Sequence, residues 1–247
     1  VVKGTAVYTG NFSPPNGPLT TTGGSYPSTT NVNTSITAGN TSLLLNGTDA
    51  AIIDKSQSVK TITLNGNVKS STTQSKYLTS SMYFATQTDF LEAELAAPIG
   101  TEDFTIEWWV YFTNINPGGS NYRGILDMRT SADTSNMWLQ QNGAGTFDYY
   151  PGYPTTGFTS STFNNNAWHH IALARESGTL RFYADGTMTG SASDSFDYDS
   201  VVLTLNHYTT PLRRWTGYAS DLRVTKGLAR YTASDETANI PSAALEG

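Results

Sequence analysis

The stretch WHHIALARESGTLRFYADGTMTG, residues 168–190, decides the fold expected for this chain. Its apolar residues recur every second position, which is the period of a β-strand with two different faces. These inward-facing residues are Ile171, Leu173, Leu180 and Phe182. A glycine turn at Gly178 separates the first two runs, and Asp185 and Gly186 supply residues that tolerate positive φ in a tight hairpin. The stretch predicts three neighbouring antiparallel strands, whose apolar face the rest of the chain must cover.

The clearest long strand elsewhere runs from Glu102 to Phe112. One set of alternating residues is expected to enter the core: Phe104, Ile106, Trp108, Val110 and Phe112. The other set is expected on the opposite face: Thr105, Glu107, Trp109 and Tyr111. Many short strands and turn signals, with almost no helical periodicity, predict an all-β fold in which two antiparallel sheets pack as a sandwich.

Composition narrows the classes of function. Only 14% of the 247 residues are charged and the net charge is −6, so nucleic acid is an unexpected partner for a chain without a basic face. The sequence has no cysteine, which excludes disulfides, thiolate zinc sites and cysteine nucleophiles. No apolar run reaches the roughly 18 residues of a membrane span, so we expect no membrane insertion. A polar, weakly charged surface is typical of extracellular, adhesive or virion β proteins.

A seven-residue motif occurs twice, as KGTAVYT at residues 3–9 and KGLARYT at residues 226–232, with five identical positions. This echo predicts a repeat unit of about 220 residues, the first stretch being the tail of a preceding copy in a longer polypeptide. The alternative is a motif that closes one domain at both ends. Residues 1–40, rich in turn-forming residues and proline, are expected to form a linker that includes this tail. Residues 41–233 are expected to form one sandwich, and residues 234–247 an extended tail.

The order of these motifs resembles that of laminin-G-like domains, which are jelly-roll sandwiches of the concanavalin A-like type. The matching stretches are WHHIA from Trp168, LRFYADG from Leu180, FTIEWWV from Phe104 and GYASDLRVTKG from Gly217. The KGxAxYT tail and residues 71–76 most resemble copies in bacteriophage virion proteins, tail fibres especially. The resemblance implies an adhesive or structural module on a virion or extracellular surface, which contacts host glycans or other virion proteins, in a larger polypeptide or a homo-oligomer.

The same fold also houses laminarinase-type glycosidases, which makes a pair of carboxylates the first catalytic candidate. Retaining glycosidases need carboxyl groups about 5–5.5 Å apart. Here Glu102 and Asp103 point to opposite faces, and Asp103 and Glu107 are separated by roughly 13 Å along a strand. We therefore expect a non-enzymatic protein with Glu107 facing solvent. An extracellular glycan-binding accessory domain or a glycan hydrolase of the laminarinase type is one alternative, and a purely architectural module without a ligand is the second.

Metal binding has one candidate residue. The loop around Asp133 resembles a pentraxin loop that supplies one calcium ligand, but the second such loop, residues 206–215, carries two arginines and no acids. No cofactor is expected, and calcium at Asp133 is the alternative. His169 and His170 point to opposite faces of their strand, so they do not form a joint metal site. His169 is expected to be a hydrogen-bonded structural residue.

Carbohydrate binding needs aromatic faces for the apolar side of a sugar and polar groups for its hydroxyls. The segment from Phe147 to Phe158 is expected to be an aromatic loop that contributes to such a site. The candidate residues are Trp138, Tyr149, Tyr150, Tyr153, Arg213, Arg214 and Trp215. The alternative is that these aromatic residues close the ends of the sandwich or pack against neighbouring subunits.

Overall fold

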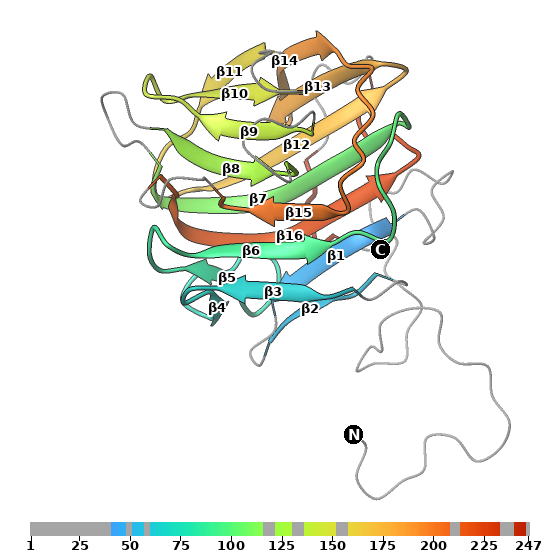
Figure 1. Ribbon diagram of the computed structural model, residues 1–247. Coiled ribbons are helices and arrows are strands. Elements are labelled where there is room, and N and C mark those ends of the chain that lie inside the picture. The colour runs from blue at the N-terminus through green and yellow to red at the C-terminus, as the bar shows by residue number, and fades with distance from the viewer. Residues whose placement is uncertain are drawn as a thin grey trace, which may run out of the picture.

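Two antiparallel sheets packed face to face form the protein, as a computed structural model shows (Figure 1). The structure describes residues 41–47, 51–56, 60–115, 122–129, 136–151, 158–207, 213–232 and 240–245. Every named element in these residues is a strand. The same residues contain no helix that is long and apolar enough to cross a membrane. The predicted all-β, two-sheet sandwich is confirmed.

The larger sheet has nine strands in the order β14-β13-β12-β7-β16-β1-β2, with β5 pairing β16 and β4 pairing β5. Its strands are β1 (Thr41–Gly47), β2 (Ile52–Asp54), β4 (Lys69–Ser71), β5 (Ser81–Phe84), β7 (Phe104–Asn114), β12 (Trp168–Glu176), β13 (Thr179–Ala184), β14 (Thr187–Ser193) and β16 (Thr216–Lys226). The seven-stranded sheet has the order β11-β10-β9-β8-β15-β6-β3. Its strands are β3 (Ile62–Asn65), β6 (Phe90–Glu94), β8 (Arg123–Asp127), β9 (Trp138–Gln141), β10 (Thr146–Tyr150), β11 (Phe158–Thr162) and β15 (Val202–Leu205).

Residues 168–190 form β12, β13 and most of β14, which are consecutive neighbours in the nine-stranded sheet. Asp185 and Gly186 join β13 to β14 with φ values of 48° and 83°. Ser177 and Gly178 join β12 to β13 with φ values of 49° and 76°. Positive φ at both turn residues matches the right-handed twist of the flanking strands. Both predicted turns are confirmed.

The core lies between the two sheets. All five β7 residues assigned to it, including Trp108, are fully buried. The prediction for the other face of β7 was wrong in one respect, because Glu107 is 0% exposed rather than solvent-facing. Trp109 does lie opposite the core, but the ammonium group of Lys76 sits 3.9 Å from its ring centroid and Tyr77 meets its edge. Chain segments therefore cover much of the outer face of the nine-stranded sheet.

Two segments are held more firmly in the sandwich than the sequence indicated. The expected aromatic loop contains strands, since Phe147–Tyr150 belongs to β10 and Phe158 begins β11. The described part of the expected C-terminal tail, residues 240–245, packs on the domain: Tyr77 donates a hydrogen bond to the carbonyl of Pro241, and Leu245 is 5% exposed. Residues 1–40, predicted to be a linker and a repeat tail, lie outside the described residues.

Candidate functional site

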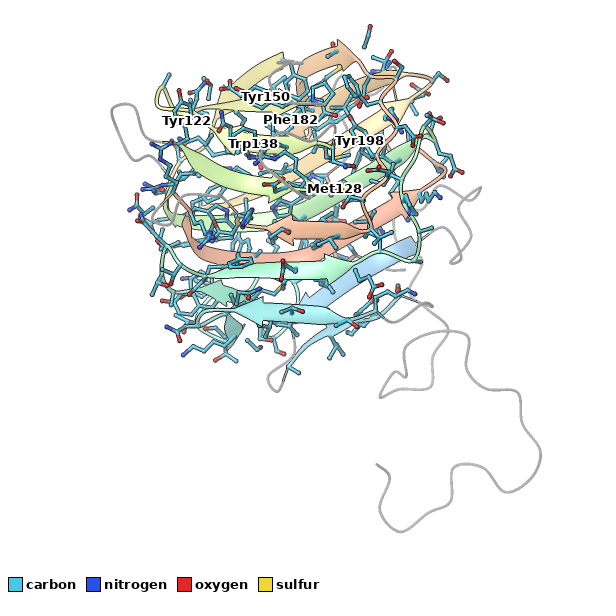
Figure 2. The ribbon with its side chains drawn as sticks, in the orientation of Figure 1. Tyr122, Met128, Trp138, Tyr150, Phe182 and Tyr198 are labelled. Carbon is cyan, nitrogen blue, oxygen red and sulfur yellow. The ribbon has the colours of Figure 1, made fainter. Side chains whose placement is uncertain are left out.

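Trp138 and Tyr150 are the two predicted sugar-contacting residues that the fold brings together. They come from neighbouring strands β9 and β10 of the seven-stranded sheet, where Figure 2 labels both. Their rings stack with centroids 5.1 Å apart. The guanidinium of Arg129 lies 3.8 Å from the centroid of the Trp138 ring, and Asp127 holds it in place with two hydrogen bonds. Trp138 is only 5% exposed, so little of its ring is left for a ligand.

Tyr149 is not part of a surface site, and its assignment there is corrected. Because side chains alternate along β10, Tyr149 enters the core while Tyr150 points outward. Its hydroxyl donates to Asp194, which also accepts a hydrogen bond from Tyr198. Burial and the neighbouring Tyr198 and Asp194 raise the pKa of Tyr149 well above its usual value, as expected for a phenol that serves as a permanent donor.

Trp215 is likewise buried rather than exposed, since its ring packs against Phe84 and Phe112. Arg214 is 7% exposed: its guanidinium lies over the ring of Phe90 and donates to the carbonyl of Thr88. Both residues therefore contribute to packing at this end of the sandwich. Arg213 is half-buried with its guanidinium 5.8 Å from the centroid of Tyr122, so it is the member of this group that stays near the surface.

The other predicted site residues lie outside the described residues. These are Tyr153 and the calcium candidate Asp133. Within the described ranges, no group of three or more His, Asp or Glu side chains is arranged to hold a metal ion. His169 has the structural role predicted for it: its ring contacts Asp185 and the carbonyl of Asn164.

The structure reveals a different aromatic arrangement on the outer face of the nine-stranded sheet. Trp168 on β12 pairs with Tyr111 on β7, which pairs with Tyr218 on β16, which in turn pairs with Tyr83 on β5. Successive ring centroids are 5.6, 5.9 and 4.7 Å apart, and the last two rings are stacked. Residues directly opposite each other share one face of a sheet. The four side chains therefore form one row across four adjacent strands, here called the aromatic row.

The aromatic row is accessible and has polar groups beside it. Trp168, Tyr111 and Tyr83 are half-buried, and Tyr218 is 7% exposed. The row continues to exposed Lys69 on β4, which pairs with Tyr83 and places its ammonium group 6.0 Å from the Tyr83 ring centroid. Burial, together with Tyr83, raises the pKa of Tyr218 above its usual value.

The residues beside the aromatic row show where it ends along β7 and how closely β16 approaches β7. On β7 the outward-facing residue before Tyr111 is Trp109, which Lys76 and Tyr77 contact, whereas the next outward residue, Thr113, is exposed and bonds the hydroxyl of Thr216. Beside the row, Gly217 has φ of 145°, and a Cβ there would lie 2.0 Å from the Tyr111 carbonyl oxygen. Only glycine lets β16 approach β7 this closely next to Tyr218.

The aromatic row could not be predicted from the sequence, because no local sequence pattern shows which residues of distant strands stand opposite one another. Each residue occupies an outward position of its own strand, which alternation alone can indicate. That Trp168, Tyr111, Tyr218 and Tyr83 stand opposite one another depends on the registers of three separate strand pairs. Adjacent aromatic faces with hydroxyl and ammonium groups beside them suit the apolar face and the hydroxyls of a carbohydrate.

A family model described as "Concanavalin A-like lectin/glucanases superfamily" matches residues 84–229. No curated protein matches the sequence. The fold is similar to the receptor binding domain of botulinum neurotoxin C/D mosaic serotype, with 14% identity, a TM-score of 0.60, and coverage of 78% of this chain and 50% of that one. It is also similar to the binding domain of Paraclostridial Mosquitocidal Protein 1, with 12% identity, a TM-score of 0.62, and coverage of 81% and 51%.

A third similar structure contains a ligand. It is the botulinum neurotoxin serotype D ligand binding domain in complex with N-acetylneuraminic acid, with 15% identity and a TM-score of 0.58. The match covers 80% of this chain and 50% of that one. This chain thus spans about half the length of the solved structures that it matches, and at these identities the likeness is one of fold.

Proposed function

The chain belongs to the concanavalin A-like lectin/glucanases superfamily, and we propose that it is a non-enzymatic carbohydrate-binding module whose ligand lies on the aromatic row. The observation that carries the proposal is the direct pairing of Trp168, Tyr111, Tyr218 and Tyr83 across four adjacent strands. Partly exposed aromatic side chains in a continuous line offer an extended ligand several contacts at once, at little cost in side-chain entropy because the rings already hold one another.

The polar groups beside the row support a sugar rather than a purely apolar ligand. The hydroxyls of exposed Thr113 on β7 and half-buried Thr216 on β16 bond each other 2.9 Å apart. Lys69 adds a cation at the β4 end of the row. Aromatic faces bind the C–H side of a pyranose, while hydroxyl and ammonium groups select the orientation of its hydroxyls. Two similar structures, the serotype D domain with N-acetylneuraminic acid and the botulinum neurotoxin DC binding domain with SialylT, are matched over about half of their length, which makes a sialylated glycan one candidate ligand for this chain.

A binding role rather than hydrolysis is supported by the state of the carboxylates first considered for catalysis. Glu107 is fully buried and bonded to Arg223 and Tyr231, so a glycosidic bond has no access to it. Asp103 accepts a hydrogen bond from the backbone of Ser177. Retaining hydrolysis needs two carboxyl groups that face one bound sugar. Glu107 and Asp103 instead accept hydrogen bonds from other parts of the chain.

The biological setting that we propose is attachment: a module of a phage virion, on a fibre or capsid appendage, that contacts glycans on the host surface. The support is the order of the sequence motifs, including the KGxAxYT tail at residues 226–232. The alternative partner is another virion protein that contacts the same aromatic row, because tyrosine and tryptophan are also enriched at protein interfaces. Binding measurements on the free chain distinguish the two partners.

A glycan array probed with the full chain, followed by calorimetric titration of the best ligand, tests the proposal. Trp168→Ala and Tyr83→Ala should each weaken binding about tenfold, which corresponds to about 1.4 kcal/mol. Tyr150→Ala is the matched control, since Tyr150 is a half-buried outward-facing tyrosine of the other sheet. Loss of binding in Tyr150→Ala alone would move the site to the seven-stranded sheet. Absence of binding to any glycan on the array would overturn the proposed function.

A further inference from the structure

The closing segment, residues 227–232, follows β16 and lies on the outer face of the nine-stranded sheet. The Gly227 amide donates to the carbonyl of Asp103, and the Arg230 amide donates to the hydroxyl of Thr105. The hydroxyl of Tyr183 donates to the carbonyl of Thr232. Backbone groups at both ends of the closing segment are thus bonded to the sheet, which fixes its position there.

Three residues of the closing segment have specific roles. Gly227 has φ of 80°, a left-handed conformation that favours glycine. Ala229 is 4% exposed and packs in a small apolar cluster with Tyr231 and residues of β12 and β13. The Tyr231 hydroxyl donates to the buried carboxylate of Glu107 at 2.7 Å. A segment that binds this face needs glycine, alanine and tyrosine at these positions.

Residues 1–9 carry the same requirements. They read VVKGTAVYT, against VTKGLARYT at residues 224–232. The glycine, alanine and tyrosine are all present, as Gly4, Ala6 and Tyr8. The identities therefore include the three positions whose contacts define the closing segment.

Two of the three differences between the stretches are coupled, which strengthens the match. The Arg230 side chain donates a 2.6 Å hydrogen bond from Nε to the hydroxyl of Thr225, at the end of β16. The equivalent positions in the first stretch are Val7 and Val2, so both members of the pair become valine. A single replacement would leave one polar group without this partner, whereas the double replacement leaves neither behind. Replacing Arg230 also removes the guanidinium that lies 3.8 Å from Glu107.

We propose that residues 1–9 are the end of the closing strand and the closing segment of a second domain of this kind. They bind the outer face of that domain's nine-stranded sheet as residues 224–232 bind this one. The partner of residues 1–9 is thus a copy of this sandwich, and residues 41–232 are one unit in a row of such domains. The inference is independent of the carbohydrate ligand, because it uses a different part of the sheet.

A fusion protein tests the proposal directly. A second copy of residues 41–223 is placed before Val1 of the full chain, so that residues 1–9 supply its only closing segment. The control fusion carries Val2→Thr, Thr5→Leu and Val7→Arg, which convert residues 1–9 into the sequence of residues 224–232. Both fusions should unfold with about twice the calorimetric enthalpy of the full chain, since this enthalpy scales with the number of folded residues.

Ala6→Glu places a charge at the position that matches buried Ala229. It should abolish folding of the added copy in the first fusion and leave the melting of the full chain unchanged. The proposal is overturned if the control fusion folds both copies while the fusion with native residues 1–9 folds only one. It is overturned equally if Ala6→Glu has no effect on the added copy.

If neither fusion folds its added copy, a double-mutant cycle in the full chain decides. Thr225→Val and Arg230→Val should each lower the melting temperature, because each breaks the pair at one end. The combined variant, which reproduces the valine pair of residues 1–9, should lose less than the sum of the single losses. Strictly additive losses would show that the paired difference carries no structural information, and the proposal would fail.

Discussion

Tyr231 donates a 2.7 Å hydrogen bond to Glu107, a residue 124 positions earlier in the chain. The same carboxylate accepts from Nε and Nη2 of Arg223 at 3.0 and 2.7 Å and lies 3.3 Å from the His170 ring. Burial opposes ionisation of Glu107, but Arg223, His170 and Arg230 outweigh it and hold the pKa of Glu107 well below its usual value. The network joins β7, β12, β16 and the closing segment. Glu107, which the sequence offered as a catalytic candidate, therefore has a structural role.

Tyr231→Phe should lower the free energy of unfolding by about 1–3 kcal/mol, because it removes a donor from a buried charged acceptor. Chemical denaturation at neutral pH measures this loss. Tyr150→Phe is the control, since the Tyr150 hydroxyl bonds the neutral amide of Gln140 at a half-buried position. A loss in Tyr231→Phe no larger than that in the control would contradict a structural role for the network.

Asp221 should make stability fall with rising pH. Burial raises the pKa of Asp221 to about 6, although Ser220 and the Leu245 amide donate to its carboxylate. The folded-state pKa is above the unfolded value, so the stabilising contribution is full below about pH 4 and is lost as the pH rises through 6. Asp221→Asn should therefore raise the free energy of unfolding at pH 8 by about 2–3 kcal/mol.

The difference in unfolding free energy between Asp221→Asn and the native protein should shrink between pH 8 and pH 4, and chemical denaturation at several pH values measures it. Changes at other carboxylates, Glu107 included, are common to both proteins and cancel in this difference. A difference that stays constant over that range would rule out Asp221 as the group responsible.

Lys76→Met should destabilise the fold by about 0.5–2 kcal/mol through loss of its contact with the Trp109 ring. The ammonium group lies 3.9 Å from that ring centroid, and Trp109 is only 2% exposed. Thermal melts of the native protein and Lys76→Met, each with and without Trp109→Ala, measure the coupling. If Lys76→Met costs as much in the Trp109→Ala background as in the native one, the contact contributes nothing.

Gly217→Ala should damage both stability and ligand binding. The added Cβ would meet the Tyr111 carbonyl, so β16 must move away from β7 beside the aromatic row. We expect a loss of about 1 kcal/mol or more in unfolding free energy, since a residue with a side chain also resists the local φ of 145°. Glycan affinity should fall in parallel. Full stability and affinity in this variant would show that the close approach is dispensable.

The sequence by itself determined β7, β12 and β13 and the two tight turns around β13, because their signals are local. The alternation in β7 and β12 identified the core residues Ile106, Trp108 and Leu173, and the positive-φ residues Asp185 and Gly186 marked a hairpin. A strand's two faces follow from the geometry of neighbouring residues alone. Those predictions needed no knowledge of what packs on either face.

Only the tertiary structure decided what happens on the outer face of the nine-stranded sheet. Glu107 is buried because the closing segment, more than a hundred residues later, covers it. The aromatic row exists because strand registers align Trp168, Tyr111, Tyr218 and Tyr83. Local periodicity says which side of a strand a residue faces, but cover and alignment come from long-range pairing between strands that are far apart in the chain.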